Sequence, residues 1–155
     1  MKNVIKKLIA AIAIVAISQA LYAGPKVNEG LYTCTVNVNG KIQSQDLNIK
    51  SKSEGLQFEG LNLSAPMSED DLFECKNTRE SASIDGFKVT AETQCTSDKI
   101  KISADIESRE HGVKLNFSIK VKAKNENHLT MDVKVSGRAN GESASQKVHM
   151  DCIKK

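Results

Sequence analysis

The chain has 155 residues, of which 39% are hydrophobic and only 4% aromatic, and its formal net charge is +3. A chain of this length is expected to fold as one domain with its own core. Nucleic-acid-binding domains usually combine a basic face with aromatic stacking side chains, whereas lysines here alternate with acidic residues along most of the chain. We therefore predict that the protein does not bind nucleic acid.

The N-terminal segment, residues 1–23, has the features of a secretory signal peptide in the required order. Three lysines precede an apolar stretch from Leu8 to Ile17, and small residues at cleavage spacing follow up to Ala20 or Ala23. The apolar stretch is about half of the roughly 20 residues that span a bilayer. We predict cleavage after Ala23, one mature domain over residues 24–155, and no transmembrane segment in that domain.

Four cysteines follow this segment, and they indicate an oxidising compartment. An even number of cysteines in an exported chain predicts two disulfides, and their spacing matches no zinc site. The short Lys-rich leader is typical of bacteria, so we expect a periplasmic or secreted protein. Cleavage would also leave 19 basic side chains against 19 acidic ones. The cysteines are Cys34, Cys75, Cys95 and Cys152.

The first predicted hairpin joins "YTCTVNV" to a strand over residues 42–50. Asn39-Gly40 between them is a strong signal for a type I′ turn. A regular register pairs Tyr32 with Leu47 on the apolar face. Ile42 then falls on the face opposite to Leu47, and this change of parity predicts a bulge between them.

A third strand, "LQFEGLNLS", follows Glu54-Gly55, and the chain is then less regular. Ser68 and Asp71 are spaced to cap a single helical turn, although the same residues also suit a loop. A strand is expected from about Leu72, with a bulge between Cys75 and Thr78.

Four consecutive hairpins complete the chain. Asp85-Gly86, Ser97-Asp98 and Asn140-Gly141 are tight-turn signals, and a longer turn surrounds His111-Gly112. The register that they predict places Cys95 opposite Ile100 and puts apolar residues on one face throughout. We predict an all-β fold, an antiparallel up-and-down meander of eight or nine strands that forms a closed or partly open barrel.

This topology predicts how the cysteines pair. Cys34 and Cys152 point inward from the first and last strands, which are neighbours if the meander closes. Cys75 and Cys95 flank one hairpin and start close together. We therefore predict the disulfides Cys34–Cys152 and Cys75–Cys95.

The stretch "VKLNFSIKVKAK", from Val113 to Lys124, alternates between apolar and lysine-rich positions. Its lysines would have to fill the lumen of a small membrane barrel, where desolvation is costly. We therefore expect the lysines to face water and the apolar residues to face inward. With few aromatic side chains to fill it, the interior is expected to contain either a partly open apolar pocket beneath this strand or a packed core.

Inward-facing polar and large side chains are the candidate ligand-binding residues. A regular register turns three glutamines inward, where their amides either need partners or orient a ligand; a twist or bulge near a strand end would expose them instead. The six candidates are Tyr32, Gln43, Gln45, Phe117, Met131 and Gln146.

The segment "EGLYTC", with Gly30 and Tyr32 opening the first strand, resembles the G-x-W start of lipocalin-like barrels. The meander and the cysteine near the C-terminus are similar to that family as well, while Tyr32 stands where the family has tryptophan. The resemblance implies transport or sequestration of a small apolar molecule.

Residues suited to catalysis or metal binding form no recognisable arrangement. His111 and His128 are expected in turns, and His149 is expected on the outward face in a solvated stripe with Lys147 and Asp151. We predict no enzymatic activity, no cofactor and no metal. Two hypotheses follow: a carrier of a small apolar ligand, and a solid-cored envelope interaction module or inhibitor that acts through its outer surface.

Overall fold

The computed structural model of the protein describes residues 24–52, 54–60 and 72–155, and all the regular structure in these ranges is β-strand. The predicted signal peptide and the predicted turn at Ser68–Asp71 lie outside the described residues. Over those ranges there is no helix of the length and apolar character needed to cross a membrane. The strands are β1 Gly30–Val38, β2 Lys41–Lys52, β3 Gly55–Glu59, β4 Leu72–Glu74, β5 Thr78–Ile84, β6 Phe87–Thr96, β7 Lys99–Ser108, β8 Val113–Asn125, β9 His128–Ala139 and β10 Glu142–Lys154.

The strands form one antiparallel sheet in the order β4-β3-β2-β1-β10-β9-β8-β7-β6-β5. The predicted meander is confirmed, and the first and last strands are neighbours as expected. The sheet is not closed, because β4 and β5 are its two edges. It has ten strands rather than eight or nine because the chain leaves the ladder at Cys75, where we expected only a bulge. One predicted strand is thereby divided between the two edges.

The tight turns adopt the conformation that their sequences predict. Asn39, Asp85 and Asn140 have φ values of 50°, 51° and 53°, and the glycine after each also has positive φ. These values are those of type I′ turns, whose twist matches that of the flanking strands. The registers that they set are as predicted, with Tyr32 opposite Leu47 and Val133 opposite Val148. The Ser97-Asp98 turn also gives the predicted register, with Cys95 opposite Ile100.

The predicted bulge in β2 is wrong. The β1–β2 ladder runs without interruption from Gly30 opposite Ile49 to Val38 opposite Lys41. Ile42 therefore lies on the outer face with 71% of its surface exposed. A regular ladder pairs the backbone polar groups of both strands, and this outweighs the cost of exposing one isoleucine.

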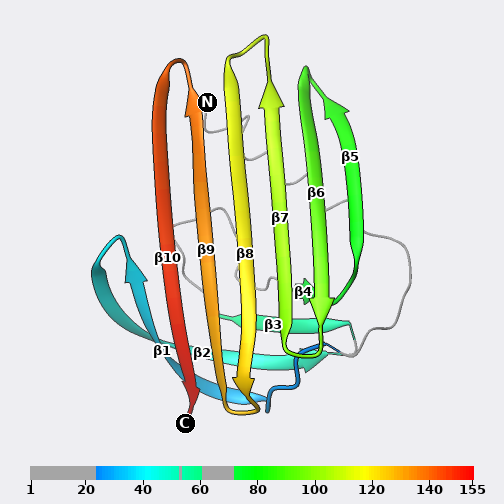
Figure 1. Cartoon of the computed structure of the whole chain (residues 1–155). Helices are drawn as coiled ribbons and strands as arrows, with labels where there is room; N and C mark the ends of the chain where they lie inside the picture. The colour runs from blue at the N-terminus through cyan, green and yellow to red at the C-terminus, as the bar shows by residue number, and fades with distance from the viewer. Residues whose placement is uncertain (1–23, 53, 61–71) are drawn as a thin grey trace.

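The sheet folds over on itself into two layers (Figure 1). The long strands β5 to β10 stand side by side, and β1, β2 and β3 cross behind them at a steep angle. The main core lies between the layers and takes buried side chains from both. Tyr32, Leu47 and Phe58 come from the crossing strands, and Val121 and Met131 come from the long strands. A smaller cluster of Phe87, Val89 and Ile106 occupies β6 and β7 elsewhere on the sheet.

The Cys75–Cys95 disulfide lies where the chain crosses from one edge of the sheet to the other. Cys75 directly follows the edge strand β4, and Cys95 lies in β6, next to the edge strand β5. The Cys75 amide donates to the carbonyl of Glu54 at 2.6 Å, and the Cys95 amide donates to Oδ1 of Asn77 at 2.8 Å. The chain therefore passes from one edge to the other, and the Cys75–Cys95 bond fixes this passage covalently.

The second disulfide, Cys34–Cys152, links directly opposed residues of β1 and β10. Both cysteines are fully buried at the junction where the sheet turns from one layer into the other. Both predicted pairings are therefore present in the structure. Two disulfides indicate an oxidising, extracytoplasmic location, because cytosolic thiols are kept reduced.

Candidate functional site

The six candidate ligand-binding residues differ in how far they are buried. Tyr32 and Met131 are fully buried in the core. Phe117 and Gln45 are partly exposed, while the two remaining glutamines, Gln43 and Gln146, are exposed.

The Tyr32 hydroxyl has partners within the protein. It donates to the backbone carbonyl of Asn28 at 2.6 Å and lies 3.2 Å from the carbonyl of Glu126. Burial raises the pKa of Tyr32 above its ordinary value, because the phenolate would lose its hydration. This hydroxyl therefore serves as a neutral anchor between the chain before β1 and the β8–β9 turn.

For two of the three glutamines, the structure has the alternative that we kept open, exposure near a strand end. The register is the predicted one, with Gln43 opposite Val36 and Gln146 opposite Val135. However, Gln43 and Gln146 lie toward hairpin ends that extend beyond the overlap of the layers in Figure 1, and water reaches them. Gln45 is deeper, with Nε2 3.9 Å from the sulfur of Met150.

Side chains pack the space between the layers. Phe58 and Phe73 meet edge to face, with ring centroids 5.1 Å apart, and Val121 and Met131 face each other across β8 and β9. Among the described residues, no buried side-chain nitrogen or oxygen lacks a hydrogen-bond partner. The main core therefore presents no unsatisfied polar group that would orient a ligand.

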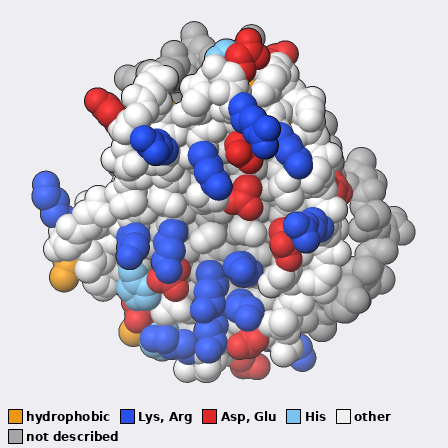
Figure 2. All heavy atoms as spheres, turned by 45° about the horizontal axis from the view of Figure 1, so that its top comes forward, with side chains coloured by type: hydrophobic (Ala, Val, Ile, Leu, Met, Phe, Trp, Pro, Cys, Tyr) orange, Lys and Arg blue, Asp and Glu red, His pale blue; other side chains and the backbone are white. Residues whose placement is uncertain are grey.

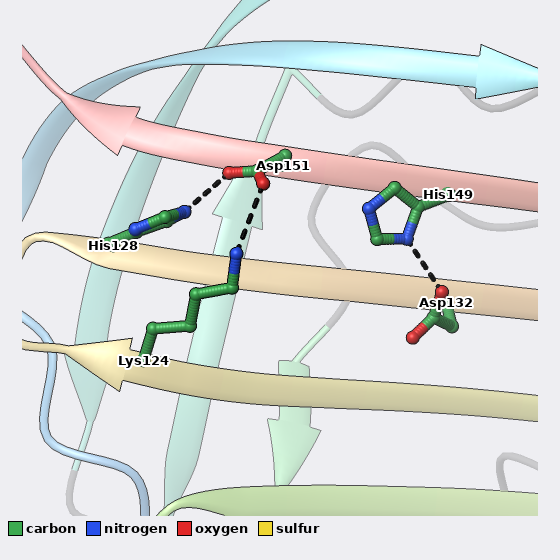
Figure 3. Close-up of polar contacts among 5 residues, drawn as sticks. All are labelled: Lys124, His128, Asp132, His149 and Asp151. Carbon is green, nitrogen blue, oxygen red and sulfur yellow. Dashed lines mark hydrogen bonds and ion pairs between the residues drawn. The ribbon is translucent and has the colours of Figure 1, made fainter.

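Two histidine–aspartate pairs lie on the outer face of β9 and β10 (Figure 3). His128 Nε2 is 2.5 Å from Oδ1 of Asp151, whose other oxygen is 3.3 Å from Nζ of Lys124. His149 Nδ1 is 2.7 Å from Oδ1 of Asp132. The outward position of His149 is as predicted, whereas His128 is the first residue of β9 rather than a turn residue.

The pairs that these histidines form cross between strands. His149 and Asp151 lie on one outward polar stripe of β10 as predicted, and each also contacts a residue of another strand. Burial alone would raise the pKa of the Asp151 carboxyl, but the hydrogen bonds from His128 and Lys124 outweigh it and hold the pKa below its ordinary value.

The outer face also contains a group of four lysines, Lys99, Lys101, Lys120 and Lys122, which we call the lysine quartet. Lys99 is directly opposite Lys122, and Lys101 is directly opposite Lys120, on the adjacent strands β7 and β8. Directly opposed side chains start about 5 Å apart at Cβ, and like charges in such pairs destabilise a sheet. Figure 2 shows lysine and arginine side chains gathered on this face of the molecule.

Carboxylates near the quartet are engaged by other side chains. Asp98 accepts a hydrogen bond from Oγ1 of Thr96 at 2.8 Å. This bond is the main cause that lowers the pKa of the Asp98 carboxyl, and the charges of Lys122 and Lys99 lower it further. Asp132, opposite Lys120, contacts His149. Over the described residues, no ion pair of 4.0 Å or less involves a quartet lysine.

The other end of the same two strands is built differently. Glu107 lies opposite Lys114, and Asn116 donates to the carboxylate of Asp105. Opposed charges or hydrogen-bonding partners therefore face each other there, whereas like charges face each other in the quartet. A third lysine pair, Lys134 opposite Lys147, extends the positive charge onto β9 and β10.

We did not predict this site, although the sequence contains its signal. Alternating lysines are visible in both strands, at residues 99 and 101 and at residues 120 and 122. Placing them opposite one another requires the register of the long turn after Ser108, which the type I′ rules do not set.

An open hollow of about 550 Å³ lies at the β8–β9 turn, outside the core. It is lined by Asn125, Glu126, Asn127, His128 and Ile153. No group of three or more described histidine, cysteine or acidic side chains is placed to hold a metal ion.

Comparison with protein-family models, curated proteins and solved structures finds no match to this chain.

Proposed function

We propose that the protein is an exported binding module that acts through the outer face of its sheet and holds an anionic partner with the lysine quartet. This proposal develops the second of the two hypotheses from the sequence, in which a solid-cored module works through its surface. The observation that carries it is the pairing of Lys99 with Lys122 and of Lys101 with Lys120.

The energetic argument starts from repulsion within the quartet. Two opposed like-charged pairs on adjacent strands reduce the stability of the sheet. The charges of Lys122 and Lys99 act on the Asp98 carboxylate, but over the described residues no carboxylate forms an ion pair of 4.0 Å or less with a quartet lysine. A bound anion with several negative charges would relieve this repulsion and contact all four ammonium groups. Binding would thus recover free energy that the unbound fold loses.

The interior favours this proposal over an apolar-ligand carrier. Tyr32 and Met131, two of the candidate ligand residues, are enclosed by other side chains, and the Tyr32 hydroxyl is bonded to the backbone. Gln43 and Gln146 are exposed to water. These positions suit a packed core better than a binding cavity.

Export is part of the proposal. The order of features in residues 1–23 matches a bacterial signal peptide, and the two disulfides require an oxidising compartment to persist. We propose that the protein works in the periplasm or outside the cell after cleavage behind Ala23.

Retention on immobilised heparin tests the proposal, with the oxidised protein eluted by a salt gradient. A variant with all four quartet lysines changed to glutamine is expected to elute at clearly lower salt than the parent. The control has the same net charge but loses four exposed lysines on other elements, and it is expected to elute close to the parent. Equal elution of the two variants would contradict the proposal. The control substitutions are Lys26→Gln, Lys41→Gln, Lys52→Gln and Lys88→Gln.

A further inference from the structure

Two large apolar side chains are exposed on the outer side of β10 and of its neighbour β1, which belongs to the crossing layer. Ile153 is 57% exposed and Leu31 is 46% exposed. They belong to the adjacent strands β10 and β1, where Thr33 is opposite Ile153. These large side chains reach water where the neighbouring outward positions are polar.

The strand registers place Ile153 at the quartet's end of the long strands. Lys122 is opposite Thr130, and Thr130 is opposite Asp151, so one row crosses β8, β9 and β10. Ile153 is the next outward residue after Asp151 on β10. Strands in a sheet are about 4.8 Å apart, so Ile153 lies roughly 10 Å from the line of Lys120 and Lys122.

The combination of lysines with exposed aliphatic side chains is typical of surfaces that lie on a bilayer. Lysines near an anionic membrane are attracted by its surface potential, and apolar side chains are stabilised at the boundary between headgroups and acyl chains. A folded sheet also presents its lysines as a broad array rather than as a cleft. Such an array fits an extended anionic surface.

Aromatic side chains, in contrast, are absent from this face within the described part of the chain. Tyr32, Phe58, Phe73 and Phe87 are buried, and Phe117 points to the inner face with Ile119. Single-stranded nucleic acids are usually held by stacking on exposed aromatic rings. The surface therefore lacks the side chains for that partner.

We propose that the anionic partner is the surface of a phospholipid bilayer, with the quartet contacting anionic headgroups and Ile153 entering the interface beside them. This inference rests on the proposed function, because it names the partner of the same lysines. The carboxylates of Asp132 and Asp151, bonded to His149 and His128, lie between the lysines and Ile153.

Co-sedimentation with vesicles tests the inference, using the oxidised protein in the form recovered from its expression host. One set of vesicles contains phosphatidylglycerol and phosphatidylcholine in equal parts, and the other contains phosphatidylcholine alone. The protein is expected to bind the first set and not the second. The binding is expected to weaken steeply as salt rises above about 0.1 M, where the Debye length is roughly 10 Å.

Variants separate the contributions of charge and apolar contact. Loss of the quartet lysines is expected to weaken vesicle binding by about 600-fold, since each of the four lysines near an anionic surface contributes roughly a fivefold factor. Ile153→Ser is expected to weaken vesicle binding by about tenfold and to leave heparin elution unchanged. The control that loses lysines on other elements is expected to bind vesicles nearly as the parent does.

The outcomes distinguish this inference from the proposed function. Retention on heparin without binding to the anionic vesicles would overturn the bilayer inference and leave the anionic-partner proposal standing. Failure to bind either would overturn both. Vesicle binding that does not change on loss of the quartet, or an Ile153→Ser variant that binds as the parent does, would also overturn the bilayer inference.

Discussion

Removal of the Cys34–Cys152 disulfide should destabilise the fold more than removal of the Cys75–Cys95 disulfide. The first closes a loop with a sequence separation of 118 residues, and the second closes one of 20 residues. In the chain-entropy description of the unfolded state, these separations correspond to about 5 and about 3 kcal/mol. Both disulfides are buried, with 0% to 5% exposure, so the packing lost on substitution by alanine is similar.

The assay is equilibrium unfolding in urea, with the parent compared with Cys34→Ala/Cys152→Ala and with Cys75→Ala/Cys95→Ala. Domains unfold with total free energies of about 5–15 kcal/mol, so the first variant should be marginal at best and the second measurably folded. Measurement near 15 °C, about where stability is greatest, helps to keep both on scale. Equal losses, or a larger loss from the shorter loop, would refute the reasoning.

Three further predictions concern packing and charge. Met131→Phe should lower the free energy of unfolding by about 1–3 kcal/mol because the core is packed, whereas Met131→Leu should cost less; a phenylalanine variant that melts with the parent would indicate spare volume. Gly137→Ala should destabilise by a similar amount, about 1–3 kcal/mol, because a Cβ there would lie 2.6 Å from the carbonyl oxygen of Lys114, and urea unfolding without any loss would contradict this. The pKa of Asp151 is lower in the folded protein, so its contribution to stability is present above its unfolded pKa of about 3.9 and is lost as the pH falls through the folded value. Asp151→Asn should therefore reduce the loss of stability that urea titrations show from pH 7 downward. An unchanged pH profile of the free energy of unfolding would contradict this.

Local turn chemistry made most of the fold predictable. Asn39-Gly40, Asp85-Gly86 and Asn140-Gly141 each require positive φ at two successive residues, so each allows few registers. Alternation of apolar residues then selects the register that places them on one face. The disulfide pairing followed, because adjacency of the first and last strands brings Cys34 and Cys152 opposite each other.

The folding of the sheet into two layers was less predictable, because it depends on contacts between distant strands. Gln43 illustrates this. It is opposite Val36 and points to the same face of the sheet, but the opposite layer does not cover it and its side chain is exposed. The split of one predicted strand after Cys75 has the same origin. Alternation shows which way a side chain points along a strand, but it does not show how far the opposite layer extends.

The lysine quartet shows the same limit for the functional surface. Its members alternate with apolar residues, and balanced charge along the chain led us to expect no basic face. The repulsive pairing arises only when β7 and β8 are brought into register, with Lys101 opposite Lys120. A prediction of this surface therefore needs a reliable register for turns longer than two residues.

The most direct test of the account is the location of anion binding on the oxidised protein, measured by amide NMR during titration with inositol hexakisphosphate as a soluble polyanion. The account predicts shift changes concentrated in residues 99–102 and 119–122, with loss of these changes in the quartet variant. Shift changes centred instead on the buried residues Tyr32 and Met131, or spread evenly over the lysines of other strands, would contradict it.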